Sequence, residues 1–380
     1  MRAVHVIASL DARDGGPTLT LPELWKHLGT AGVEVRALTT HAPGAPPPAL
    51  REGVALRSFP RGFPSPIKRA PDLAAALREE GRAADVIHNH GCWLFPNWAA
   101  GRMARRLAKP LIISPLGHLD AWSLTRNPWR KRLIRALVEG RNWRSARAWV
   151  AKSEKEAAEI RARGLSGIVR VIPNGVDPAR YAAPFDPGPI CDLHPVLRER
   201  RVLLFLSRLH PKKGLPLLLT VWRSLVSRFP DWTLLIAGGA DSEHARDVKE
   251  GARDLAAAGR VVFSGAVSGR MKDAAFGVAQ LFVLPSVSEN FGQAVLEALA
   301  SGLPCIVSRA CPWSEIATRD FGWWMLPEAT ALRRALEDAL ATPPTDLAAK
   351  GARGRAWALR EFGWPGLARR MADLYREVST

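Results

Sequence analysis

Two carboxylates and two cations stand where the chain could bind a phosphorylated ligand. Glu289 precedes a predicted helix, and Glu297 lies about two turns into it, on a face that can turn back toward a ligand at the helix end. A helix cap plus an ordinary surface glutamate would show the same spacing, so spacing alone leaves both interpretations open. Arg208 and Lys213 follow a predicted strand, before a helix that opens with Gly214. A guanidinium and an ammonium there can neutralise a diphosphate, with a plain basic turn as the alternative.

Unpaired backbone amides could assist these cations. A predicted strand ends at Pro285, and the next helix starts near Phe291 or Gly292, so the first helical amides suit a phosphate or a sugar oxygen. Gly15 and Gly16 follow the first predicted strand, where a backbone can approach phosphate closely, although a flexible turn is the alternative. No G-x-G-x-x-G motif is present, which argues against a dinucleotide oxidoreductase. No D-x-D pair is present either, so we expect cations and amides, rather than a metal ion, to hold a diphosphate.

The elements that must position these groups alternate between short apolar strands and helices. This order predicts an α/β fold with parallel sheets covered by helices on both faces, and ligands beyond the carboxyl ends of the strands. We expect a surface loop at 42–71 and a linker at 178–195, both rich in proline. The predicted strands are 3–9, 33–39, 85–90, 111–114, 202–206, 232–237, 261–263, 281–284 and 305–307.

Length and composition bound the class of protein. A chain of 380 residues with 47% apolar and 24% charged residues predicts a soluble protein of two domains, and no stretch reaches the roughly 20 apolar residues that cross a bilayer. The formal net charge of +18 favours anionic partners. The four cysteines show no metal-site spacing and indicate a reduced, cytoplasmic protein.

Four segments together resemble glycosyltransferase family 4, whose members are retaining enzymes with the GT-B fold. Glu289 and Glu297, with Asn290-Phe291-Gly292 between them, resemble the E-x7-E signature of that family. Residues 205–215 are similar to its G-R-x-x-x-x-K-G segment, residues 171–177 to its phrase before the interdomain linker, and Gly15-Gly16 to its first loop. The match runs from near residue 3 to about 327. The resemblance implies two Rossmann-like doubly wound domains facing a central cleft, at 1–185 and 196–363, with a C-terminal helix at about 364–380 that crosses back to the first.

The resemblance also implies roles for individual residues. Glu289 would hold hydroxyl groups of the donor sugar, and Glu297 would bind the ribose. Gly15 and Gly16 would touch the donor phosphate, and the departing diphosphate would be stabilised by the cations described above. The other expected donor contacts are Gly265, Val267, Asn290, Phe291 and Gly292.

One family histidine is displaced in this chain. The family phrase S-P-H-G-M-L-D-P-W corresponds to residues 114–122, where Leu116 occupies the histidine position and His118 follows two places later. We keep His118 as a catalytic candidate, with a structural hydrogen bond as the alternative. His90, Trp93 and Asp120 are acceptor candidates, and the same structural alternative holds for His90.

A basic stretch at 126–149 has tryptophan on one side of a predicted helix. Such a helix suits an anionic membrane surface, although packing on its own sheet with the arginines in water is equally open. The basic residues are Arg126, Arg130, Lys131, Arg132, Arg135, Arg141, Arg144 and Arg147, against the single acid Glu139.

These observations predict a retaining, metal-independent glycosyltransferase without a cofactor. It would move a sugar from a UDP- or GDP-type nucleotide sugar to a glycan or lipid-linked glycan in cell-surface polysaccharide or lipopolysaccharide synthesis, in the cytoplasm or at the inner face of the membrane. One alternative is a nucleotide-sugar 2-epimerase of the same fold. The other is a basic nucleic-acid-binding protein, for which no helix-turn-helix, RNP or zinc motif is present; we predict no nucleic-acid partner.

Overall fold

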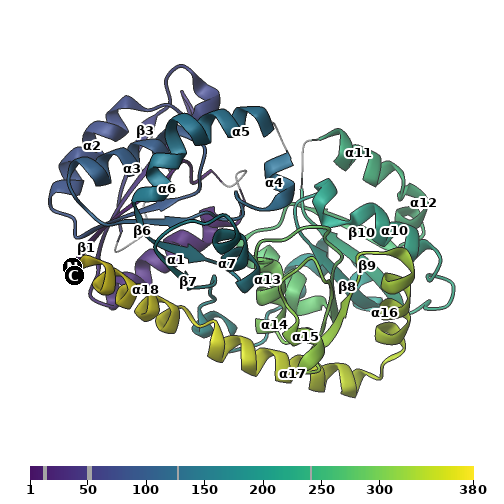
Figure 1. Ribbon diagram of the computed structural model, residues 1–380. Coiled ribbons are helices and arrows are strands. Elements are labelled where there is room, and N and C mark those ends of the chain that lie inside the picture. Colours follow the sequence, from purple (N-terminus) through teal and green to yellow (C-terminus); the bar gives the residue numbers. More distant parts are fainter. Residues whose placement is uncertain (12–14, 49–53, 126–127, 240–241) are drawn as a thin grey trace. The chain divides into compact units, whose positions relative to one another are not determined.

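The computed structural model describes residues 1–11, 15–48, 54–125, 128–239 and 242–380. The chain divides into two compact units (Figure 1). The first comprises Met1–Gly175 together with Trp364–Thr380, and the second comprises Val176–Gly363.

The described part of the first unit is built on a parallel sheet of seven strands in the order β3-β2-β1-β4-β5-β6-β7. The central strands β1 and β4 are almost completely buried, as expected where helices cover both faces. The strands are β1 (Arg2–Ile7), β2 (Glu34–His41), β3 (Ala55–Pro60), β4 (Val86–His90), β5 (Leu111–Ser114), β6 (Ala146–Ala151) and β7 (Ile168–Val171). The helices are α1 (Pro17–Thr30), η2 (Ser65–Ile67), α2 (Pro71–Arg82), α3 (Phe95–Arg106), α4 (Ala121–Thr125), α5 (Pro128–Ile134), η3 (Arg135–Glu139), α6 (Gly140–Ser145), α7 (Glu154–Ala162) and α18 (Trp364–Ser379).

The described part of the second unit has six parallel strands in the order β10-β9-β8-β11-β12-β13. The strands are β8 (Arg201–Leu206), β9 (Trp232–Ala237), β10 (Val261–Gly265), β11 (Leu281–Leu284), β12 (Cys305–Ser308) and β13 (Gly322–Met325). The helices are η4 (Pro178–Tyr181), α8 (Gly188–Leu193), α9 (Val196–Glu199), η5 (Pro211–Lys213), α10 (Leu215–Arg223), α11 (Glu243–Glu250), α12 (Arg253–Ala257), α13 (Gly269–Val278), α14 (Gln293–Ala300), α15 (Glu315–Thr318), α16 (Ala329–Ala341) and α17 (Pro344–Glu361).

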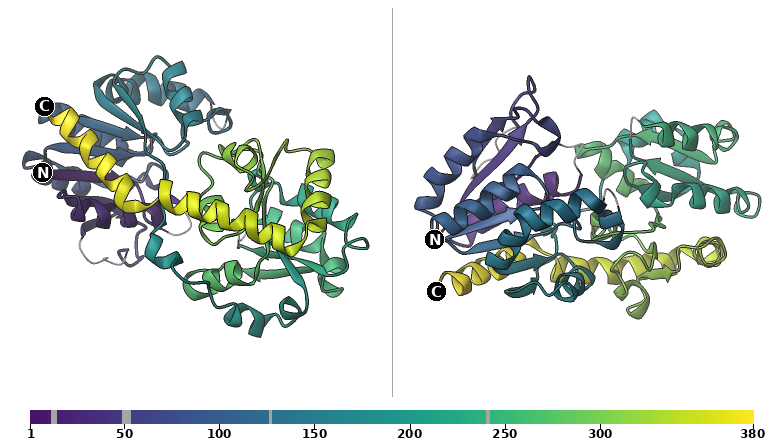
Figure 2. Two further views of the ribbon diagram at one scale, coloured as in Figure 1. Left: turned by 90° about the horizontal axis from the view of Figure 1, so that it is seen from below. Right: turned by 45° about the horizontal axis from the view of Figure 1, so that its top comes forward.

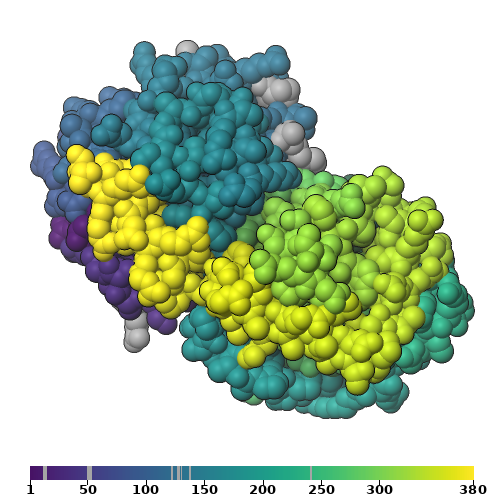
Figure 3. Space-filling model, turned by 60° about the horizontal axis from the view of Figure 1, so that its bottom comes forward, coloured from purple at the N-terminus to yellow at the C-terminus, as the bar shows by residue number. Residues whose placement is uncertain are grey.

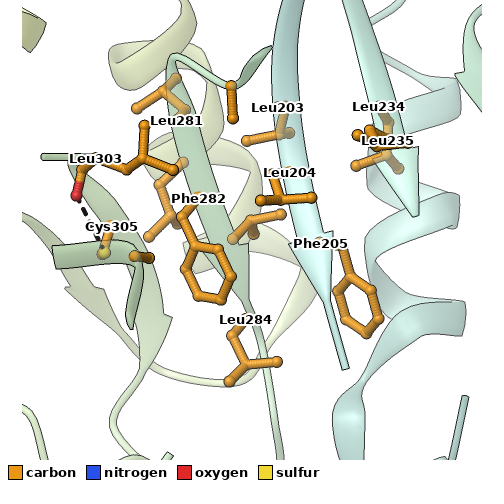
Figure 4. Close-up of a cluster of buried hydrophobic side chains, with 14 of the residues drawn as sticks. Leu203, Leu204, Phe205, Leu234, Leu235, Leu281, Phe282, Leu284, Leu303 and Cys305 are labelled. Carbon is orange, nitrogen blue, oxygen red and sulfur yellow. Dashed lines mark hydrogen bonds between the residues drawn. The ribbon is translucent and has the colours of Figure 1, made fainter. Parts of the chain in front are cut away.

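The core of the second unit explains why its strands were predictable. Leu203, Phe205 and Phe282 are completely buried on the neighbouring strands β8 and β11 (Figure 4). A strand buried on both faces needs apolar residues at every position, so it appears in the sequence as a continuous apolar run.

Two sequence expectations about loops are wrong. Residues 42–71 do not form a loop throughout, because β3 adds a half-exposed edge strand there beside β2. The expected linker at 178–195 instead packs into the second unit, where Tyr181, Ile190 and Cys191 are buried. The chain therefore enters the second unit at Val176, nine residues before the expected end of the first domain at residue 185.

The C-terminal helix α18 belongs to the first unit. Trp364, Leu367, Met371 and Tyr375 recur at helical spacing and are buried against the first unit. The helix packs beside α1 on the outside of the unit (Figures 2 and 3). Among the described residues, no helix combines the length and the apolar character that a bilayer span requires.

Candidate functional site

The centre of the second sheet is a topological switch point. Strand β8 leads to β9 on one side, whereas its other neighbour, β11, leads on to β12. In open α/β sheets, ligands bind beyond the carboxyl ends of the strands at such a point. Arg208 and Lys213 follow β8, and Glu289 follows β11, so the topology brings these candidates to one edge of the sheet.

Lys213 and Glu289 form an ion pair. The Lys213 Nζ contacts Glu289 Oε1, and Ser286 Oγ donates a hydrogen bond of 3.0 Å to the same oxygen. Both charged side chains are largely buried. Glu289 is therefore held in place at the switch point. Arg208 is exposed.

A glycine allows the two loops to meet. Gly214 has a φ of +70°, and a Cβ atom built on it would lie 2.1 Å from the carbonyl oxygen of Pro285. The Val287 amide donates to the Lys212 carbonyl over 2.8 Å, so the loops are in backbone contact. Only glycine permits this approach, and the approach brings Lys213 to Glu289.

Contacts with Trp313 anchor the chain just before α14. Gly292 caps the helix with a φ of +87°. The Phe291 ring is buried with its centre 5.0 Å from that of Trp313, whose indole N–H donates to the Phe291 carbonyl. The Phe291 side chain is therefore part of the core, and only its backbone can serve a ligand. Asn290, by contrast, is half-buried.

Glu297 is not an ordinary surface glutamate. Its Oε2 lies 2.7 Å from the Nζ of Lys272 on α13, and the side chains are only 10% and 13% exposed, respectively. Lys272 was not anticipated, because no local signal connects two residues on different helices.

Gly265, with a φ of +74°, ends β10, and the half-buried Val267 follows it. These two therefore lie at the same carboxyl edge of the sheet as Glu289.

The loops at the corresponding edge of the first sheet carry the other candidates. Gly15, with a φ of +105°, and Gly16 lie just before α1. The residues 12–14 between them and β1 lie outside the described part of the chain.

His118 has a defined hydrogen-bonding state. Its Nδ1 accepts the Cys92 backbone N–H at 2.9 Å, so a neutral ring carries its hydrogen on Nε2. Burial, and then the Lys131 ammonium, lower the pKa of His118 to about 4. The turn before it places Leu116 at a φ of +57°, and the buried Glu156 accepts the Gly117 N–H at 2.7 Å. At neutral pH, His118 therefore presents an Nε2–H donor.

Trp93 lies directly beside His118. Its indole N–H donates to the His118 carbonyl at 3.2 Å, and the side chain is half-buried. Its backbone, at a φ of +79°, donates to Glu139 Oε1 at 2.7 Å. Glu139 is buried, which raises the pKa of its carboxyl group. Glu139 is the one acid among the basic residues of 126–147, and this contrast was the feature of the sequence that could have indicated its contact with the Trp93 backbone.

Two further acceptor candidates, His90 and Asp120, are buried. His90 is 1% exposed and its ring faces the interior, where its Nε2 lies 2.9 Å from Nδ1 of His5. Asp120 is buried, and its Oδ1 accepts the backbone N–H of Ser123, so it caps α4. Both residues therefore take part in hydrogen bonds of the fold, and their role toward an acceptor stays a prediction.

His5, His88 and His90 form the one group in the described residues with spacing that could hold a metal ion. The ring centres lie 4.1–5.1 Å apart; His90 stacks on both His5 and His88, and the rings of His5 and His88 are tilted against each other. The Trp25 indole N–H donates to His5 Nδ1 at 2.8 Å, so a neutral His5 carries its hydrogen on Nε2. The lone pair of His5 Nδ1, which a metal ion would need, is thus already used by the hydrogen bond from Trp25.

The network continues to α18 and β5. His5 Nε2 lies 3.1 Å from the Tyr375 hydroxyl, which in turn lies 2.7 Å from His88 Nδ1. His88 Nε2 then lies 2.8 Å from the Ser114 hydroxyl. One order satisfies these three contacts: His5 donates to Tyr375, Tyr375 to His88, and His88 to Ser114. The His90 Nε2–H then shares the His5 Nδ1 acceptor with the Trp25 N–H. We therefore interpret the cluster as a hydrogen-bonded core of neutral imidazoles and assign no metal to it.

The basic stretch is split between core and surface. Trp143 is buried and packs on Trp93, with ring centres 5.3 Å apart. Trp129 and Leu133 on α5 are 67% and 52% exposed. The predicted apolar side is therefore not a single stripe, and part of it faces water. Arg126 lies outside the described residues.

Two doubly wound units, with an ion pair and a helix start at a switch point, define a nucleotide-dependent α/β enzyme of the GT-B type. Two family models match the chain: "Glycosyl transferase 4-like domain" over residues 15–175, and "Glycosyl transferases group 1" over residues 194–354. The chain belongs to this glycosyltransferase family and is a retaining enzyme that uses a nucleotide sugar. The predicted family, fold class and reaction are thereby confirmed.

Individual relatives agree with this assignment. The GDP-mannose:cellobiosyl-diphosphopolyprenol alpha-mannosyltransferase of Xanthomonas campestris is 27% identical over 332 residues, which cover 84% of this chain and 81% of that protein. The sucrose-phosphate synthase of Thermosynechococcus elongatus has a TM-score of 0.80 at 21% identity, covering 99% and 98% of the two chains. HepE of Anabaena, solved with UDP and glucose, has a TM-score of 0.77 at 18% identity, covering 99% and 100%.

Proposed function

We propose that this glycosyltransferase moves a hexose from a UDP- or GDP-linked donor to a glycan or lipid-linked glycan during assembly of cell-surface polysaccharide or lipopolysaccharide. The observation that carries the donor side is the Lys213–Glu289 pair at the switch point of the second sheet. The acceptor class is supported by the Xanthomonas relative, whose name gives a diphosphopolyprenol-linked acceptor.

In the proposed mechanism, cations and amides hold the donor diphosphate without a metal ion. Arg208 and Lys213 neutralise the charge that develops on the departing diphosphate, and the first amides of α14 add partial positive charge. Glu289 holds hydroxyl groups of the donor sugar, and Glu297 holds the ribose. The leaving phosphate oxygen takes the proton of the acceptor hydroxyl as that hydroxyl attacks from the same face, which retains the anomeric configuration.

The acceptor side is proposed to use His118 and Trp93. The Nε2–H of His118 can donate to a sugar hydroxyl, because its Nδ1 is occupied by the Cys92 amide. The half-buried Trp93 ring beside it offers a flat apolar face to a sugar ring.

Binding of nucleoside diphosphates tests the donor side. Thermal unfolding would be measured with UDP, GDP, ADP and dTDP, each with and without its sugar. The cognate nucleotide should raise the unfolding midpoint, and the increase should grow with the ratio of ligand concentration to dissociation constant. The variant K213M should weaken that binding, and K350M, which removes a lysine paired with Asp320 elsewhere in the unit, is the matched control. Failure of all four nucleotides to bind would contradict the proposal.

Attachment to an anionic membrane surface is the proposed location, at the cytoplasmic face. The exposed Trp129 and Leu133 supply apolar side chains, and exposed arginines of the same segment supply charge. The arginines exposed in this segment are Arg132, Arg135, Arg141, Arg144 and Arg147.

Liposome flotation tests this location. The protein should float with vesicles that contain anionic lipid and not with purely zwitterionic vesicles. The double variant W129S/L133S should lose flotation, whereas L326S, at an exposed leucine of the second unit, should retain it. Flotation that is independent of anionic lipid would contradict the proposal.

A further inference from the structure

Glu297 on α14 is held by a lysine from another helix. Its Oε2 lies 2.7 Å from Nζ of Lys272, which lies near the start of α13. Both side chains are nearly buried, at 10% and 13% exposure. Removing one partner of such a pair would leave a charge without compensation in a poorly solvated place, so the pair is a strong constraint on the glutamate.

Two neighbouring residues of α13 form ion pairs with other parts of the second unit. Lys272 contacts Glu297, and the next residue, Asp273, binds the guanidinium of Arg180. Arg180 in turn lies over the ring of the buried Tyr181, with its Cζ 5.8 Å from the ring centre. The pairs use neighbouring positions of one helix, so α13 anchors both a carboxylate and a cation on this side of the unit.

The second carboxylate oxygen is left to accept hydrogen bonds. Glu297 Oε1 has no hydrogen-bond partner among the residues that the structure describes. The Lys272 ammonium stops the carboxylate from rotating freely and offsets its charge. An offset charge matters here, because a bare carboxylate would repel a diphosphate bound at the same edge of the sheet.

We infer that Lys272 is a positioning residue, which orients Glu297 so that Oε1 accepts hydrogen bonds from the vicinal 2′- and 3′-hydroxyl groups of a ribonucleotide. This inference rests on the proposed function, because it takes the ligand to be a nucleoside diphosphate. It adds a residue outside the E-x7-E segment and gives it a task that acts through Glu297.

Ligands that lack the ribose hydroxyl groups isolate this contact. Isothermal titration would compare the nucleoside diphosphate that the wild-type protein binds with its 2′,3′-dideoxy counterpart. Hydrogen bonds to a charged group predict that the wild type binds the dideoxy ligand about 10-fold or more weakly. In K272M, the ratio of the dissociation constants of the dideoxy ligand and the ribonucleotide should fall to within about threefold. K272R should restore most of this ratio, because arginine keeps a cation beside Glu297.

Two controls separate positioning from general damage. K350M removes an ion-paired lysine elsewhere in the same unit and should keep the wild-type ratio. E297Q should lose the ratio as K272M does, because the amide accepts hydrogen bonds without the charge. A K272M protein that keeps the wild-type ratio would overturn the inference and leave the proposed function intact, whereas a wild-type protein that binds no nucleoside diphosphate would overturn both.

A crystal structure of the wild-type complex tests the inference without any substitution. The Lys272–Glu297 contact should persist with the nucleotide bound, and a ribose oxygen should lie within hydrogen-bonding distance of Glu297 Oε1. A Lys272 side chain that leaves Glu297 to bind the ligand would overturn the inference.

Discussion

The buried histidine cluster predicts that the first unit loses stability in mild acid. His5, His88 and His90 are at most 1% exposed on the paired strands β1 and β4. Burial, and then the Lys152 ammonium, lower the pKa of His5 to about 3. Burial also lowers the pKa of His88 and of His90 well below the usual value. The folded protein therefore keeps these imidazoles neutral where the unfolded chain takes up protons.

The size of the effect follows from proton linkage. An unfolded histidine has a pKa near 6.5, so at pH 5 it is almost fully protonated, while His5 in the folded protein is not. His5, which stays neutral in the folded protein, lowers the free energy of unfolding at pH 5 by about 2 kcal/mol, and His88 and His90 shift it in the same direction. The stability is present above about pH 6.5 and is lost as the pH falls toward the native pKa. Even the loss from His5 alone is a large fraction of the stability of many domains.

The slope of stability against pH isolates the histidines from other titrating groups. Urea unfolding from pH 7.5 to 5, with amide exchange of the β4 peptide to report on the first sheet, would give that slope. The variant H88Q should reduce this slope between pH 6 and 5, by at most about 1.2 kcal/mol per pH unit, because one imidazole fewer takes up a proton on unfolding. The core variant L73A should lower stability without changing the slope. An H88Q slope equal to that of the wild type would refute the reasoning.

Three further substitutions test the packing and charges described above. G214A should lower the midpoint of thermal unfolding by at least about 4 °C and weaken nucleotide binding, because its Cβ would meet the Pro285 carbonyl, whereas G366A, with open space around it on α18, should not. Y375F should cost about 2–4 kcal/mol in urea unfolding, since His88 Nδ1 and His5 Nε2 would both lose their partner; unchanged stability would contradict the proton order assigned to the cluster. K213M should weaken binding of the cognate nucleoside diphosphate about tenfold or more in isothermal titration, and an unchanged affinity would remove Lys213 from the donor site.

Sequence reasoning succeeded where the signal is local. Continuous apolar runs predicted β8 and β11, because a parallel strand buried on both faces needs apolar side chains throughout. It failed for β3 and for the segment 178–195, where proline suggested loops. β3 is a half-exposed edge strand, and Tyr181, Ile190 and Cys191 owe their burial to contacts with distant residues.

The candidate site shows the same division. The sequence placed Lys213 and Glu289 in loops after strands, but their contact across 76 positions depends on the adjacency of β8 and β11 and on the close approach at Gly214. The Lys272–Glu297 pair had no sequence signal at all.

By itself, the sequence determined the alternation of strands and helices and the glycosyltransferase signatures, because periodicity and short motifs are properties of neighbouring residues. Only the tertiary structure decided that His90 and Asp120 take part in hydrogen bonds of the fold and that Lys272 holds Glu297. Strand order and helix packing set which distant side chains meet, and the burial that follows sets which of them can reach a ligand.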